Sequence, residues 1–190
     1  MKSALKLALM LTVWSVIACC ALALVNSFTA PIIEARTAET IKNALTEIFP
    51  EASTNESIIA ELSSDNPVIK FDNAYAVKSN AGALGIVITA TGPTYNASTI
   101  MVGIDLDGNI KTIKFISNND TKGIGSKVVE PHFTEQFNGK NARDAFKVAA
   151  DVDGVSGATV SSKGVAKILK TACTSGIDYL KAHNLLREAK

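Results

Sequence analysis

A short run of small and hydroxyl-bearing residues, DVDGVSGATVSSK at positions 151–163, is the part of this 190-residue chain best suited to hold a ligand. Gly157 and Ala158 let backbone N–H groups approach a bound molecule, and hydroxyls surround them at Ser156, Thr159, Ser161 and Ser162. Apolar residues at helical spacing follow, so the run stands where a helix begins. The first N–H groups of a helix are unpaired and its dipole is positive there, which predicts an anion such as a phosphate near Thr159. An ordinary helix cap made by these hydroxyls is the simpler alternative.

Other chemistries fit the sequence poorly. Residues 154–158, GVSGA, differ by one residue from the GxSxG pattern of esterases, and His183, the only later histidine, lies five positions from Asp178 on one predicted helix. Gly123 and Gly125 lack the third glycine and the βαβ surroundings of a dinucleotide loop. His132 and His183 have no cysteine or carboxylate partners at the spacing of a zinc or haem site. We therefore predict no catalytic residue and no metal ligand.

The run at 153–162, DGVSGATVSS, resembles the SGAT signature of a known family. This is the FMN-binding domain shared by the G subunit of the Rnf electron-transport complex and the C subunit of the sodium-translocating NADH:quinone reductase. The likeness continues upstream in TGPTY at 91–95, similar to a Gly-Pro-rich turn, in the strand pattern at 100–108, and in DTKGIG at 120–125, similar to ETPGLG. Phe133, Phe137 and Gly139 resemble the phenylalanine-containing stretch that comes next. The order of these segments agrees with the family over most of the chain after its N-terminal apolar run.

The resemblance implies that Thr159, the last residue of SGAT, carries FMN through a phosphoester bond. It also implies a separate magnesium-dependent flavin transferase with FAD as donor, so Thr159 is expected to be a modified acceptor and no catalyst. The other expected FMN contacts are Ser156, Gly157, Ala158, Val160, Ser161 and Lys163 near the phosphate and ribityl chain, Thr121, Gly123, Ile124 and Gly125 near the isoalloxazine, and Thr91, Gly92 and Tyr95 in the Gly-Pro turn. A solvated lysine on a helix face is an equally good interpretation of Lys163.

The chain departs from the family's pattern at four positions. Asp120 and Lys122 replace the Glu and Pro of ETPGLG, and Thr94 replaces a glycine after the proline of the turn. Asn118 stands where many members have a histidine. A proton-linked role of that histidine therefore cannot be transferred to this chain.

The function that the resemblance implies is that of an electron carrier. We expect a subunit with covalent FMN in a membrane complex that couples ferredoxin and NAD redox chemistry to cation transport. Its sequence offers no NAD, iron–sulfur or quinone motif, so other subunits must supply donor and acceptor, and no turnover is expected from this subunit alone. Two alternatives stay open: the C subunit of a sodium-translocating NADH:quinone reductase, and a flavin-free anchored module that helps to assemble a complex.

The N-terminal segment predicts a membrane anchor. Residues 7–25 carry no charge and, at about 1.5 Å per helical residue, are long enough to cross about 30 Å of hydrocarbon. Lys2 and Lys6 precede the run and the first acidic residue, Glu34, follows it, which places the N-terminus in the cytoplasm and the rest outside. A cleaved signal peptide, or lipoprotein processing at Cys19, are alternatives with the same sidedness. Apart from Lys2 and Lys6, the chain has 17 of its 19 basic residues and all 18 acidic residues. This nearly neutral balance does not favour nucleic-acid binding.

The remaining pattern predicts an α+β domain with an antiparallel sheet flanked by helices. A helix is expected over 37–49 behind Thr37, and a surface connection with one short helical piece over 51–67. Strands are expected over 74–78, 84–91, 98–105 and 110–117, with a hairpin turn at 105–109, and a final helix over 161–187. This divides the chain into an anchor at 1–25, a helical connection at 26–73 and the FMN-binding domain at 74–190. Cys173 is the only cysteine of the folded part, so no internal disulfide is expected there.

Overall fold

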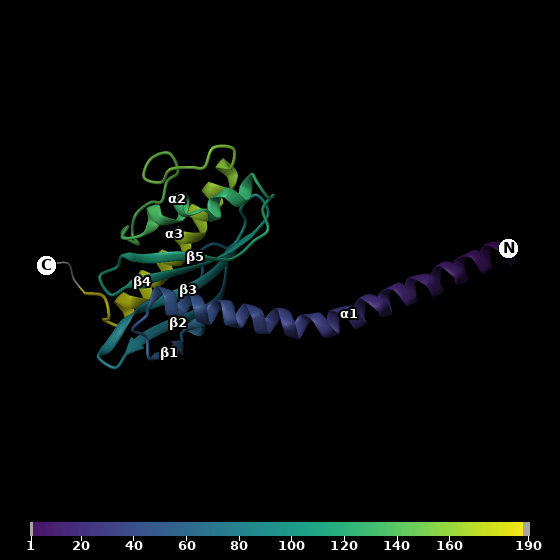
Figure 1. Ribbon diagram of the computed structural model, residues 1–190, viewed down its shortest axis with the longest axis horizontal. Coiled ribbons are helices and arrows are strands. Elements are labelled where there is room, and N and C mark those ends of the chain that lie inside the picture. Colours follow the sequence, from purple (N-terminus) through teal and green to yellow (C-terminus); the bar gives the residue numbers. More distant parts are fainter. Residues whose placement is uncertain (1, 188–190) are drawn as a thin grey trace. The chain divides into compact units, whose positions relative to one another are not determined.

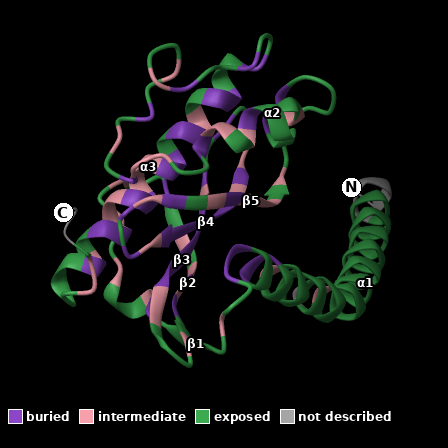
Figure 2. Cartoon of the chain, turned by 60° about the vertical axis from the view of Figure 1, so that its left-hand side comes forward, coloured by how far each residue is buried: buried purple, intermediate pink, exposed green. Residues whose placement is uncertain are grey.

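The computed structural model describes residues 2–187, except for the side chains of residues 2–5 and 34. The chain forms two compact units, Met1–Ile41 and Lys42–Lys190. Helix α1 (Lys2–Ile48) makes up the first unit, and its last turns belong to the second. Among the described residues, one helical stretch, Lys6–Ile48, is long and apolar enough to cross a membrane. Its large apolar side chains from Leu7 to Ile33 are exposed, which suits a helix surrounded by lipid (Figure 2).

The helix expected to start near Thr37 is instead a continuation of α1. The hydroxyl of Thr37 donates to the carbonyl of Ile33, and the hydroxyl of Thr40 donates to that of Arg36, each at 2.9 Å. Both side chains thus bond backward along a running helix, where a capping residue would accept from N–H groups ahead of it. The expected start at Thr37 was therefore wrong.

The second unit contains a five-stranded antiparallel sheet in which each strand pairs with the next along the chain (Figure 1). Its strands are β1 (Thr54–Ser57), β2 (Lys70–Ser79), β3 (Gly82–Gly92), β4 (Ser98–Asp105) and β5 (Ile110–Asn118). The four expected strands are confirmed as β2 to β5. The edge strand β1 was missed because its residues, TNES, are polar and all exposed, so they show no alternation. The connection expected over 51–67 thus holds this strand, together with the short 3₁₀ helix η1 (Ile59–Glu61).

Helix α3 (Thr159–Ala182) covers one face of the sheet. Gly176 accounts for the slip in its apolar stripe, since a Cβ there would lie 2.8 Å from Ile104 and 2.9 Å from Ile86. The absent side chain lets the helix touch β3 and β4 directly. The helix ends at Ala182, short of the expected residue 187, and Asn184 just beyond it is in the left-handed region at φ 52°.

Buried aromatic rings fix the segment between β5 and α3. It contains η2 (Gly125–Val129), α2 (Pro131–Thr134) and η3 (Glu135–Phe137), followed by irregular backbone. Phe137 packs edge to face between Phe133 and Phe146, with ring centroids 5.6 and 5.9 Å apart, and all three rings are buried. Such contacts stabilise a segment that has little regular hydrogen bonding.

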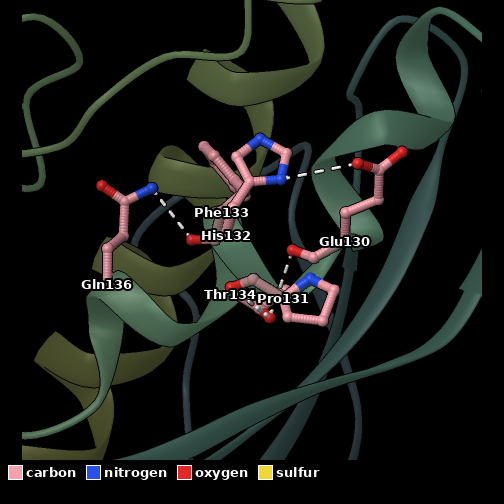
Figure 3. A network of polar contacts seen from close by, with 6 residues as sticks. All are labelled: Glu130, Pro131, His132, Phe133, Thr134 and Gln136. Carbon is pink, nitrogen blue, oxygen red and sulfur yellow. Dashed lines mark hydrogen bonds and ion pairs between the residues drawn. The ribbon is translucent and has the colours of Figure 1, made fainter.

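Gln136 anchors the backbone that leads into α3. Its side-chain amide donates to the carbonyls of Phe133 and Asp153, and its oxygen accepts the Asp153 N–H at 2.7 Å. Beside it, exposed His132 lies 3.5 Å from the carboxylate of Glu130 (Figure 3). His132 is thus a surface histidine.

Candidate functional site

A cavity of about 510 Å³ lies at the N-terminal end of α3. Three segments far apart in the sequence meet around it: the turn after β3, the loop after β5, and the turn that begins α3. The residues that line it are Tyr95, Thr121, Ile124, Gly125, Gly157, Ala158, Thr159, Val160 and Ser161. All nine are among the residues expected to contact FMN. The volume falls within the range of about 300–1,000 Å³ that is usual for small-molecule sites.

The start of α3 is held in place from behind. The buried hydroxyl of Ser162 donates to the carbonyl of Ala158 and accepts the N–H of Val155, both at 3.0 Å. Gly157 has φ 78°, a left-handed conformation that glycine adopts without strain. The turn before the helix is therefore fixed by Ser162, one of the hydroxyls that the sequence places in this turn but not one of the expected FMN contacts.

The first N–H groups of α3 are left without protein partners. Ala158 stands at the N-cap and makes no side-chain capping bond. Within the described part of the chain, no hydrogen bond uses the N–H of Thr159, Val160 or Ser161. The simple helix cap considered for these hydroxyls is therefore not what the structure contains. Unpaired donors and the positive end of the helix dipole make this edge of the cavity suited to a phosphate.

Thr159 presents a free hydroxyl at the edge of the cavity. The residue is exposed, and its hydroxyl makes no hydrogen bond with the described residues. A second protein could therefore reach this oxygen without unfolding the turn.

Exposed apolar side chains surround the rest of the cavity. Tyr95 is 66% exposed, Ile124 56% and Val160 59%, and each comes from a different one of the three segments. Large apolar side chains gathered around one cavity commonly mark a ligand site. They would suit the flat, mostly apolar ring system of a flavin.

Asp120 joins the walls of the cavity. It is 5% exposed, and its Oδ1 accepts hydrogen bonds from the hydroxyl of Thr94 and the N–H of Asn96, each at 2.7 Å. A Cβ on Gly125 would lie 2.7 Å from the Cβ of Asp120 and 2.9 Å from Oγ of Ser161, so the loop after β5 packs tightly against α3. Burial raises the pKa of Asp120, but hydrogen bonds to the charged carboxylate, foremost from Asn96, outweigh burial and lower it.

Three of the four departures from the family's pattern belong to one hydrogen-bonded network. Thr94 and Asp120 bond directly, and the side-chain oxygen of Asn118 accepts the N–H of Asp120 at 2.8 Å. The hydroxyl of Thr94 occupies space that a glycine would leave empty. The substitutions at these positions are therefore physically coupled, and the sequence alone gave no sign of this coupling.

Helix α3 also presses against the turn after β3. A Cβ on Gly164 would lie 2.6 Å from both the carbonyl oxygen of Pro93 and the Cα of Thr94. This close approach sets the distance between the wall that carries Tyr95 and the wall that carries Thr159.

Five expected FMN contacts do not line the cavity. Ser156 and Gly123 are neighbours of lining residues, whereas Thr91 bonds to Asp72 and Thr99 across the strands, and Gly92 packs against Ile168 of α3. Lys163 lines a different hollow, on the side of α3 that carries Lys167. Thr91 and Gly92 therefore have evident packing roles in the sheet.

The thiol of Cys173 is fully buried. Burial raises its pKa to about 12 and makes it unreactive.

Comparison with known proteins identifies the family. The model of the FMN-binding domain matches residues 95–174, a range that includes every residue lining the cavity. The chain is 32% identical to the G subunit of the Na(+)-translocating ferredoxin:NAD(+) oxidoreductase complex of Acetobacterium woodii, over 86% of this chain and 87% of that protein. This chain belongs to the G-subunit family of ion-translocating oxidoreductase complexes. Another member, the G subunit of the ion-translocating oxidoreductase complex of Methanosarcina acetivorans, is 29% identical over 95% of this chain and 96% of that protein.

A solved structure supports the fold of this G-subunit family member. The crystal structure of Shewanella oneidensis NqrC superposes with a TM-score of 0.52 and 24% identity, covering 66% of this chain and 72% of that chain. The expected α+β class and antiparallel sheet flanked by helices are thereby confirmed, as is the expected family.

Proposed function

We propose that this G-subunit family member is an electron carrier that holds one FMN covalently on Thr159, within a membrane complex that couples ferredoxin and NAD redox chemistry to cation transport. A bound flavin accepts or donates one or two electrons. The observation that carries the proposal is the cavity itself, where unpaired N–H groups, the free hydroxyl of Thr159 and an apolar mouth meet. The electron donor and acceptor would belong to other subunits.

The residues around the cavity fit the parts of FMN. The N–H groups of Thr159, Val160 and Ser161 would bind the phosphate at the helix dipole. Tyr95, Ile124 and Val160 would cover the isoalloxazine and limit its contact with water. Asp120 is a positioning residue, because it fixes the turn that bears Tyr95 to the loop that bears Ile124.

Attachment would need a second enzyme. The Thr159 oxygen would form a bond to the phosphorus of the FMN half of FAD, the bond to the AMP half would break, and AMP would leave with the electron pair. The hydroxyl proton would pass to a base of a magnesium-dependent flavin transferase, since an unactivated threonine is a weak nucleophile. The exposed position of Thr159 supports this route.

The membrane topology is a further part of the proposal. Residues 7–25 would anchor the chain with its N-terminus in the cytoplasm, and residues 74–190 would form the FMN-binding domain outside it, joined through residues 26–73. The charge asymmetry around the apolar run supports this orientation.

The test is a denaturing gel of the full chain coexpressed with a flavin transferase and viewed under ultraviolet light. We expect a fluorescent wild-type band, a dark Thr159→Ala band, and an unchanged band for Ser156→Ala, a neighbouring hydroxyl that does not line the cavity. Cleavage after Lys147 and Lys163 gives one peptide that contains Ser156, Thr159, Ser161 and Ser162, in which fragment masses locate the flavin.

A dark wild-type band, with the transferase active on a control substrate, would refute covalent attachment. The chain would then be better explained as a flavin-free anchored module that helps to assemble a complex. Fluorescence retained in Thr159→Ala with the flavin on a neighbouring serine would move the attachment site without removing the carrier function.

A further inference from the structure

Four lysines line a second hollow, of about 520 Å³, beside the candidate FMN cavity. We call it the lysine groove. It is formed by Ala145, Phe146, Lys147, Val148, Lys163, Ala166, Lys167 and Lys170. No carboxylate is among these residues, and the floor is apolar, with Phe146 and Ala166 buried. The groove therefore combines a strongly positive rim with space for an apolar side chain.

Three of these lysines have no protein partner. Lys170 is committed to the fold, because its ammonium donates to the carbonyls of Arg143 and Asp144, both at 2.8 Å. Within residues 2–187, the side-chain ammonium groups of Lys147, Lys163 and Lys167 make no hydrogen bond or ion pair, although the backbone N–H of Lys147 donates to the carboxylate of Asp151; all three lysines are exposed. Their charges are available to a partner.

Folding alone does not account for this arrangement. Lys163, Lys167 and Lys170 lie at spacings of four and three on one face of α3, where like charges repel and destabilise a helix. Lys163 also lies near the positive end of the helix dipole, which disfavours a cation. Residues 26–190 hold 17 basic and 18 acidic residues, so the lysine groove is a local concentration of positive charge in a nearly neutral part of the chain.

We propose that the lysine groove binds an acidic segment of another subunit of the same membrane complex. Carboxylates would offset the repulsion among the lysines, and an apolar side chain of the segment would enter over Phe146 and Ala166. Lys163 and Lys167 follow Thr159 by about one and two helical turns, or roughly 6 and 12 Å along the axis. The partner would therefore be held beside the flavin. This inference rests on the proposed function for its role in electron transfer, whereas the docking itself needs no flavin.

The first test is carbodiimide cross-linking of the native complex in membranes, followed by peptide mass spectrometry. This reagent joins a lysine amine directly to a carboxylate in contact with it. We expect cross-links from Lys147, Lys163 or Lys167 to Asp or Glu residues of another subunit. They should also form in Thr159→Ala, so that failure of flavin attachment and failure of docking are distinguishable.

The second test is retention of the full chain in the purified complex as a function of salt. Lys167→Glu should lower retention about fivefold or more and remove the salt dependence that its charge contributes, because an attraction becomes a repulsion. Lys167→Arg should retain binding. The matched control is Lys70→Glu on β2, an exposed lysine with the same change of charge away from the groove, which should behave as wild type.

Two results would overturn the proposal. One is that the three lysines react with an acetylating reagent equally fast in the complex and in the isolated chain, with no cross-link to another subunit. The other is protection in membranes that disappears in the detergent-purified, fully assembled complex, which would assign the lysine groove to anionic lipid headgroups.

Discussion

Asp120 offers the sharpest test of how the cavity walls are held together. Replacing it with alanine removes the acceptor of the buried Thr94 hydroxyl, which keeps only its 3.2 Å contact with the hydroxyl of Ser98, and the acceptor of the N–H of Asn96, an exposed residue. A buried donor left without its acceptor costs about 1–3 kcal/mol, and the N–H of Asn96 can turn to water, so Asp120→Ala should lower the free energy of unfolding by about 1–3 kcal/mol. Asp120→Asn keeps an oxygen acceptor but loses the charge, and should cost about 1–2 kcal/mol because charge-assisted bonds are the stronger ones.

The effect of Asp120 should also depend on pH in a defined direction. Its folded-state pKa is lowered, so the folded form favours the ionised carboxylate more than the unfolded chain does. This contribution is complete above the unfolded pKa of about 3.9 and is lost as the pH falls through the lower folded value. The stability gap between wild type and Asp120→Asn should therefore be constant from about pH 5 to 8 and shrink below about pH 4.

Hydrogen exchange measured by mass spectrometry on the full chain is the suitable assay. The single tryptophan, Trp14, lies in the first unit, so its fluorescence does not report on the domain. Peptides from β4 and β5 should lose protection in Asp120→Ala and keep it in Asp107→Ala, an exposed turn carboxylate whose side chain bonds to no described residue. The reasoning would be refuted if Asp120→Ala lowered the free energy of unfolding by less than about 0.5 kcal/mol. It would also be refuted if the stability gap between wild type and Asp120→Asn widened on acidification.

Three further substitutions test the packing behind the site. Gly164→Ala should destabilise the domain by about 1–3 kcal/mol, because a clash with the backbone of Pro93 outweighs the better helix propensity of alanine. Faster hydrogen exchange of peptides from the turn at 93–96 would show this loss of stability. Ser162→Ala leaves the buried N–H of Val155 without an acceptor and should lower the free energy of unfolding by about 1–3 kcal/mol. Hydrogen exchange of α3 peptides should show a lower urea midpoint, and the yield of attached flavin should fall. Leu169→Ala, at a fully buried position, should cost about 2–5 kcal/mol in the same assay without moving the site of flavin attachment.

The sequence was most informative where local pattern and burial agree. The runs that form β2 to β5 either alternate between apolar and polar residues or are continuously apolar. Strands β3 and β4 are buried on both faces of the sheet, and a continuous run of β-branched apolar residues is typical of such a strand. The small-residue run at 151–163 was predicted to lead into a helix for a similar reason, because apolar residues at helical spacing follow it. The strands and this small-residue run could be predicted because each is determined mainly by residues close together in the sequence.

What the sequence did not indicate depends on contacts between distant segments. The bond from Thr94 to Asp120 joins residues 26 positions apart, and nothing local to either marks them as partners. The edge strand β1 is polar because it is exposed, and it is ordered only through pairing with β2. Lys163 has the right position in the sequence for a phosphate contact, but the rotation of α3 directs it into the lysine groove.

The charges around α3 bear on why a covalent bond would be useful here. No lysine or arginine is among the residues that line the candidate FMN cavity, so a phosphate there would be held by N–H groups and the helix dipole alone. Such contacts are weaker than bidentate pairing with arginine. A phosphoester to Thr159 would keep the effective concentration of FMN high without a cation in the cavity. Lys163 and Lys167 would then remain free for a partner subunit, with flavin retention and docking assigned to different residues of one helix.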